Sequence, residues 1–81
     1  MSEEMRTACA EVFESWIAAG TQRAQLGGLP AHRARALIIT LLAALEGAFV
    51  LARATRSTEP LLIAGEALAR ATEEALRETA S

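Results

Sequence analysis

Residues 36–54 read ALIITLLAALEGAFVLARA and form the longest apolar run in the chain. One acid, Glu46, and one glycine, Gly47, interrupt the run. Because alanine and leucine lose little conformational freedom in a helix, this composition predicts a long helix. A helix that is apolar on nearly every side must be covered on nearly every side, so the rest of the fold has to be arranged around it.

The predicted helix extends from about residue 30 to about residue 55 and has surfaces of different kinds, taking about 100° per residue. A broad arc carries large side chains, namely Leu37, Ile38, Leu41, Leu42, Leu45 and Phe49. Another side is formed by small residues, mostly Ala36, Thr40, Ala43, Ala44, Gly47 and Ala54. Between them lies a narrow strip with Arg35, Glu46 and Arg53. We expect the large face to fill the core of the domain and the small face to meet a second copy of the chain.

Two further helices are expected, over about residues 3–25 and about residues 58–78. Ser2 can cap the first, and Gly27-Gly28 ends it. Its apolar face comprises Met5, Cys9, Val12, Phe13, Trp16 and Gly20, so we expect Cys9 to be a buried structural thiol. Ser57 or Thr58 caps the last helix, whose stripe comprises Leu61, Gly65, Leu68, Thr72, Ala75 and Leu76. The prediction is an all-α, antiparallel three-helix domain whose second and third helices form a four-helix bundle with a symmetry mate.

The length of 81 residues allows one domain, residues 1–81. Such a chain buries only about 60% of its unfolded surface, so a homodimer is expected to supplement the core. The net charge of −2 gives no electrostatic footprint for nucleic acid. The acidic N-terminus is not a secretory signal, and the single cysteine suits a reducing compartment. We therefore expect a cytoplasmic protein with no membrane span.

Glu46 is the polar residue with the most to explain. A carboxylate surrounded by apolar side chains is costly unless it finds a partner, so we expect it to be buried and paired with an arginine. Two interpretations stay open: a group that accepts hydrogen bonds in a cavity or at a dimer seam, or a structural acid paired within or between chains. Gly47, beside it, favours close approach of another helix, with Ala43 as the other small residue of the pair.

No catalytic or metal site is predicted. His32 is the only histidine and has no second ligand at a suitable spacing. Motifs of nucleotide-binding loops, serine hydrolases and zinc proteases are absent from the sequence. We predict that the protein is not an enzyme and needs no cofactor. A small helical enzyme of the chorismate-mutase kind is a third reading, which would require several arginines to converge on one pocket.

Three stretches carry a family resemblance: EVFESWIAAGTQRAQLGG (11–28), AALEGAFVLARATR (43–56) and EPLLIAGEAL (59–68). In this order and spacing they resemble the C-terminal, effector-binding and dimerisation domain of TetR-family transcriptional repressors, in the LmrA/YxaF-like branch. The resemblance implies that the last two helices form the dimer bundle. Together with the small face, it gives nine interface candidates: Thr40, Ala43, Ala44, Gly47, Leu51, Leu61, Gly65, Leu68 and Thr72. It also implies a ligand pocket with Phe13, Trp16, Leu41, Leu45 and Phe49 as candidates.

The sequence also departs from that family, because it contains no helix-turn-helix domain. We therefore expect this chain not to bind DNA by itself and its effector cavity to lack some walls. The function predicted is dimerisation and sensing of a small hydrophobic molecule, as in the regulatory half of a TetR-like repressor. The alternative is a purely structural homodimerisation module with no ligand.

Overall fold

The structure of the protein is a computed structural model that describes residues 1–80 and consists of three α-helices. They are α1 (Glu3–Leu26), α2 (Ala31–Thr55) and α3 (Glu59–Ala80), and the described residues contain no strand. The helices begin and end within two residues of the positions expected. The all-α fold predicted from the sequence is confirmed.

Local sequence sets the ends of the helices. Ser2 Oγ accepts a hydrogen bond from the Met5 N–H at 3.1 Å and caps α1 as predicted. Gly28 adopts φ = 114°, a conformation that glycine reaches without steric penalty, and the chain turns there toward α2. Ser57 Oγ accepts a hydrogen bond from the Glu59 N–H at 3.1 Å at the start of α3.

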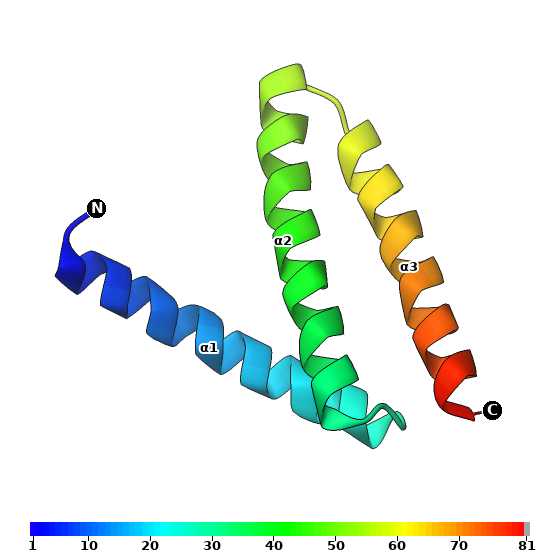
Figure 1. Ribbon diagram of the computed structural model, residues 1–81. Helices are drawn as coiled ribbons and strands as arrows, with labels where there is room; N and C mark the ends of the chain where they lie inside the picture. The colour runs from blue at the N-terminus through cyan, green and yellow to red at the C-terminus, as the bar shows by residue number, and fades with distance from the viewer. Residues whose placement is uncertain (81) are drawn as a thin grey trace.

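The three helices do not pack equally. Helix α2 lies in the centre, α3 runs antiparallel beside it, and α1 spreads away from both toward its N-terminus (Figure 1). Among the described residues, α2 packs on both neighbours, whereas no Cα atom of α1 lies within 8 Å of one in α3. The prediction of three antiparallel helices is therefore correct for α2 and α3 and wrong for α1, which crosses α2 near one end.

The molecule is only about one helix thick. Its extents are 43 × 33 × 13 Å, and a helix with its side chains is about 10–12 Å across. The radius of gyration is 14.6 Å, compared with about 12 Å for a compact domain of this length. The accessible surface is 6049 Å², compared with about 4,700 Å² for a compact monomer of this mass. The single chain therefore leaves much of its apolar surface uncovered.

The core is small and lies at the turn between α1 and α2, against the C-terminal part of α3. Leu29 in the turn, Ala34 in α2 and Ala75 in α3 are at most 5% exposed and form one buried cluster. Ala24 and Leu37 pack against this cluster. The largest buried side chain among the described residues is thus a leucine in a turn, which the pattern of the helices did not indicate.

One close approach and one ion pair hold α1 against α2. A Cβ added at Gly20 would lie 2.9 Å from Ile38 Cγ2, so α1 reaches α2 most closely where it has no side chain. Arg35 donates two hydrogen bonds to the Glu14 carboxylate, at 2.8 and 3.2 Å. Both contacts lie at or beyond the middle of α1, at Glu14 and Gly20, and the N-terminal part of the helix projects away from α2 (Figure 1).

Helix α2 is long and apolar enough to cross a bilayer, judged by length and composition alone. It is the one such helix among the described residues. The central helix of a soluble domain passes the same test, so this property does not distinguish the two environments.

Candidate functional site

An apolar groove of about 420 Å³ runs between α2 and the beginning of α3. Its walls are formed almost entirely by small or aliphatic residues, namely Ala43, Ala44, Gly47, Ala48, Leu51, Pro60, Ile63 and Ala64, with Glu59 as the one charged group. We call the side of the α2–α3 hairpin that carries this groove the groove face. The small side of α2 predicted from the sequence therefore lies on an open surface of the chain.

Four of the predicted interface residues line the groove, all from α2: Ala43, Ala44, Gly47 and Leu51. Thr40 is exposed on the same helix. The predicted residues of α3 do not line this groove, since Leu61, Leu68 and Thr72 are half-buried and Gly65 is exposed. Helix α3 contributes Ile63 instead, which is 60% exposed. Sequence reasoning missed Ile63 because it lies outside the single stripe assigned to α3.

Gly47 has no contact that explains it within one chain. A Cβ added there would meet no atom within 4 Å. Glycine inside a helix costs about 1 kcal/mol relative to alanine. The neighbours of Gly47 in this chain thus leave room for a side chain, and only a body outside the chain could require its absence.

Glu46 is exposed, and no described residue forms an ion pair with it. Arg35, predicted to share the charged strip of α2 with Glu46, is paired with Glu14 instead. The predicted burial of Glu46 and its predicted arginine partner therefore do not occur within the single chain. Both stay predictions about an assembled form.

The predicted pocket residues are spread over two helices. Phe13 and Trp16 stack edge to face in α1, with ring centroids 5.5 Å apart, and are 39% and 52% exposed. Leu41 and Leu45 are half-buried in α2. Phe49 is 55% exposed and lines a groove at the α2–α3 turn that includes neither aromatic residue of α1. The assignment of these five residues to one pocket stays a prediction.

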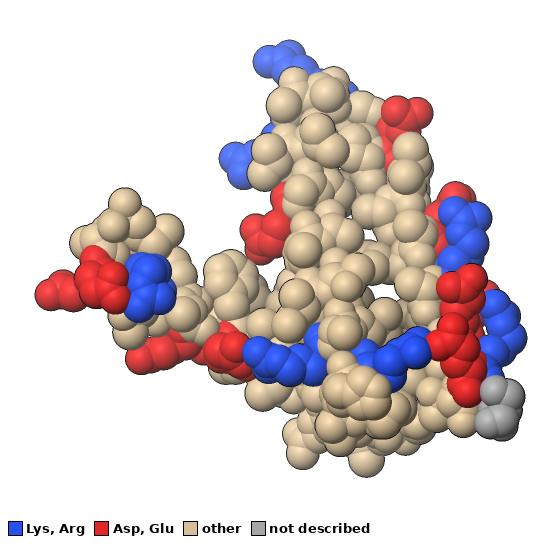
Figure 2. All heavy atoms as spheres, viewed as in Figure 1, with Lys and Arg blue, Asp and Glu red and all other residues tan. Residues whose placement is uncertain are grey.

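The charged side chains lie mostly at the margins. Figure 2 shows acids and bases beside one another both at the N-terminal end of α1 and where α1 meets the hairpin, and also along the outer edge of α3. Much of the hairpin surface between them is uncharged. The Arg35 hydrogen bonds lower the pKa of the Glu14 carboxyl. Mixed signs of this kind do not form the basic patch that nucleic acid requires.

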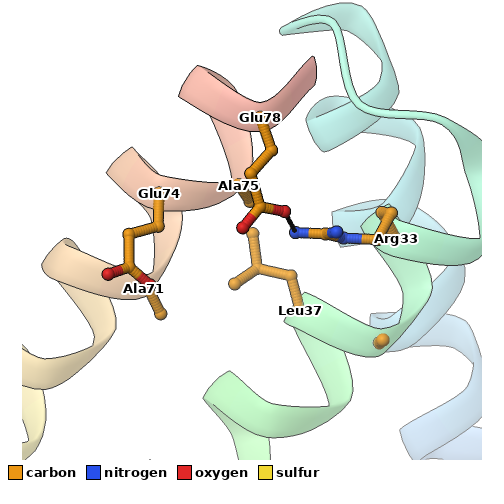
Figure 3. Close-up of a pocket in the computed structure, with 7 residues that line it drawn as sticks. Arg33, Leu37, Ala71, Glu74, Ala75 and Glu78 are labelled. Carbon is orange, nitrogen blue, oxygen red and sulfur yellow. Dashed lines mark ion pairs between the residues drawn. The ribbon is translucent and has the colours of Figure 1, made fainter. Parts of the chain in front are cut away.

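A second ion pair joins the two ends of the hairpin. Arg33 in α2 and Glu78 in α3 point toward each other across the top of Leu37, with nitrogen and oxygen 2.7 Å apart (Figure 3). They border a cavity of about 240 Å³ that also includes Ala71, Glu74 and Ala75. Both side chains are at least 42% exposed, so water screens the ion pair and it adds little to the stability of the hairpin.

The single cysteine and the single histidine are both exposed, and neither belongs to a metal site among residues 1–80. Cys9 is exposed, so the prediction of a buried thiol is wrong for the single chain, because the part of α1 that carries it projects away from α2. His32 is exposed in the first turn of α2. Among residues 1–80, no group of three or more His, Cys, Asp or Glu side chains could hold a metal ion.

A family model described as the C-terminal domain of LmrA/YxaF-like transcriptional regulators matches residues 1–67. The chain belongs to this family. The match spans α1, α2 and the first part of α3, so it includes the groove face and the Phe13–Trp16 pair. Comparisons with curated proteins and with solved structures found no match.

The membership identifies this LmrA/YxaF-like domain as part of a TetR-type transcription regulator and not as a member of an enzyme family. It also accounts for α2, which is the central helix of a soluble regulator domain and not a membrane span.

Proposed function

We propose that this LmrA/YxaF-like domain serves dimerisation and the sensing of a small hydrophobic molecule in a cytoplasmic TetR-like repressor. The family membership supports the regulatory role. The observation that carries the dimer is the open groove face, where Gly47 meets no atom of its own chain.

The surface area supports the same conclusion. The chain exposes 6049 Å², about 1,300 Å² more than a compact monomer of its mass. A standard interface removes about 800 Å² from each partner. Two groove faces related by a two-fold axis would cover this excess and complete a four-helix bundle from α2 and α3 of both chains.

The sensing role rests on the large exposed side chains. Phe13, Trp16 and Phe49 lie outside the groove face and leave aromatic surface for a ligand. In an intact repressor, effector binding would favour a conformation in which the DNA-binding heads are wrongly spaced. DNA contact would belong to those heads, since the face of this domain in Figure 2 carries acids and bases side by side and no continuous basic patch.

The alternative is a purely structural dimerisation module. It is favoured by one observation: the groove that Phe49 lines has no residue of α1 in its lining, so Trp16 is not part of it. This alternative predicts that no apolar compound raises the melting temperature of the dimer, whereas a sensing domain is stabilised by its ligand, and the stabilisation grows with the logarithm of the ligand concentration above Kd.

The dimer is tested by replacing Gly47 with leucine. Within one chain the new side chain has room, so helicity should be kept or increased. In the dimer it would force the helices apart, and sedimentation velocity should show mostly monomer at concentrations where the parent chain is dimeric. Ala18→Leu, on the exposed outer side of α1, is the matched control and should leave the dimer intact. If the Gly47→Leu dimer is as stable as the parent dimer, the groove face is not the dimer interface.

A further inference from the structure

A second groove lies at the α2–α3 turn, on the opposite side of α2 from Gly47. Phe49 lines it and follows Gly47 by two residues, which is a rotation of about 200° around the helix. We call this the turn groove. We infer that the turn groove binds the carboxylate end of an apolar molecule, with Arg53 and Arg56 as the groups that hold the charge.

The floor of the turn groove is apolar. Phe49, Ala52 and Leu61 line it, and the groove has a volume of about 320 Å³. This value lies at the lower end of the range of about 300–1,000 Å³ that small-molecule sites occupy. Phe49 is 55% exposed, so a hydrocarbon chain laid on it would remove apolar surface from water.

The rim of the turn groove carries two guanidinium groups. Arg53 and Arg56 both line it, and neither forms an ion pair with an acid among residues 1–80. Arg23, Arg70 and Arg77 also form no ion pair with a described acid, but none of these three lines the turn groove. A guanidinium offers parallel N–H donors that match the two oxygens of a carboxylate, so an anionic ligand would find free partners here.

The nearest acid on α2 does not neutralise this rim. Glu46 precedes Arg53 by seven residues, which places its backbone about 10 Å away along the helix axis. Glu59, in the first turn of α3, lines the groove face instead. The turn groove is therefore positive and apolar, and this combination selects an apolar anion over a neutral or cationic compound.

The backbone at Arg56 is a further sign that the turn is specialised. Arg56 adopts φ = 51° and its N–H donates to the Ala52 carbonyl, closing α2 in a left-handed conformation. Glycine is the usual residue at this position of a helix end, because a side chain strains it. The chain keeps an arginine there, directly beside the groove.

The inference rests on the sensing half of the proposed function, because Phe49 belongs to both. It adds the chemical class of the ligand, a carboxylate with a short aliphatic or aromatic body. It also separates the ligand from the dimer, since the turn groove and the groove face occupy opposite sides of α2.

Calorimetric titration of the 81-residue chain with octanoate and with 1-octanol, at low salt, tests the charge preference. We expect octanoate to bind about five- to tenfold more tightly than octanol, and this preference to shrink at high salt. Arg53→Gln and Arg56→Gln should each remove most of the preference, and Phe49→Ala should weaken both ligands. Arg70→Gln, an exposed arginine on α3, is the matched control and should change nothing.

The possible results distinguish failure of the carboxylate inference from failure of the proposed sensing function. Equal binding of octanol and octanoate would overturn the inference and leave ligand sensing standing. A preference for octanoate that survives both arginine replacements would place the charge site elsewhere and overturn it as well. If neither compound binds while the chain still sediments as a dimer, the inference fails, and the melting-temperature test with other apolar compounds then decides whether the sensing role fails with it. Circular dichroism of each variant verifies that the helices are kept.

Discussion

Helices α1 and α3 both carry an apolar stripe, yet they pack against α2 in different ways. Helix α3 lies along α2, and its small residues let the two backbones run side by side (Figure 1). Helix α1 crosses α2 at Gly20, and Met5, Val12 and Trp16 on its stripe stay 46–60% exposed. The stripe of α3 is thus mostly covered by α2, with Leu61, Leu68 and Thr72 half-buried and Ala75 buried, while the α1 stripe is left for something else to cover.

The largest effect is expected at the turn residue that both regions share. Leu29→Ala should lower the free energy of unfolding by about 3 kcal/mol, because it empties the centre of the buried cluster. Urea denaturation measures this loss. Leu26→Ala changes the same side chain three residues earlier, where it is 85% exposed, and should change stability little. Equal losses in the two variants would mean that the cluster does not join the helices.

A smaller effect should follow from breaking the crossing of α1 alone. Gly20→Leu adds a side chain whose Cβ would lie 2.9 Å from Ile38 Cγ2, so we expect a net loss of about 2 kcal/mol in the free energy of unfolding despite better helix propensity. Ala19→Leu, on the exposed neighbouring position, is the control. Hydrogen exchange should show α1 amides losing protection while α3 amides keep theirs. Uniform loss in all three helices would contradict the separation of the two regions.

The smallest effect concerns the ion pair between α1 and α2. Because Arg35 holds the pKa of the Glu14 carboxyl below its usual 4.5, the folded state binds fewer protons there than the unfolded chain does. The stabilisation is present above pH 4.5 and is lost as the pH falls through the lowered pKa. Melting temperatures at pH 6 and pH 3 should differ less in Glu14→Gln than in the parent chain. The same pH response in both would show that the pair adds nothing.

Much of this fold could be predicted from local sequence, because helix ends depend on neighbouring residues. Ser2 and Ser57 cap helix starts with their hydroxyl groups, and Gly28 forms the turn after α1 with a positive φ. The small side of α2 was recognisable for the same reason, since a helix repeats its faces regularly. The small residues on this side of α2 line the open groove.

What could not be predicted depends on contacts between distant residues. A periodic stripe gives the direction of a face but not the point where another helix crosses it, so the departure of α1 was missed. Glu14 and Arg35 are far apart in sequence, and nothing in either neighbourhood couples them. Ile63 was overlooked because α3 was assigned one apolar face and in fact presents two, one toward α2 and one beside the groove.

The buried cluster has a consequence for how this domain is delimited. The family match ends at residue 67, yet Ala75 belongs to the cluster and Glu78 pairs with Arg33, both in the part of α3 beyond it. The segment that matches the family model is therefore shorter than the segment that supplies the buried cluster and its neighbouring ion pair. A chain trimmed to the match would keep the family's signature and lose the residue that closes its interior, so proteolytic mapping, and not sequence similarity, is the way to choose its boundaries.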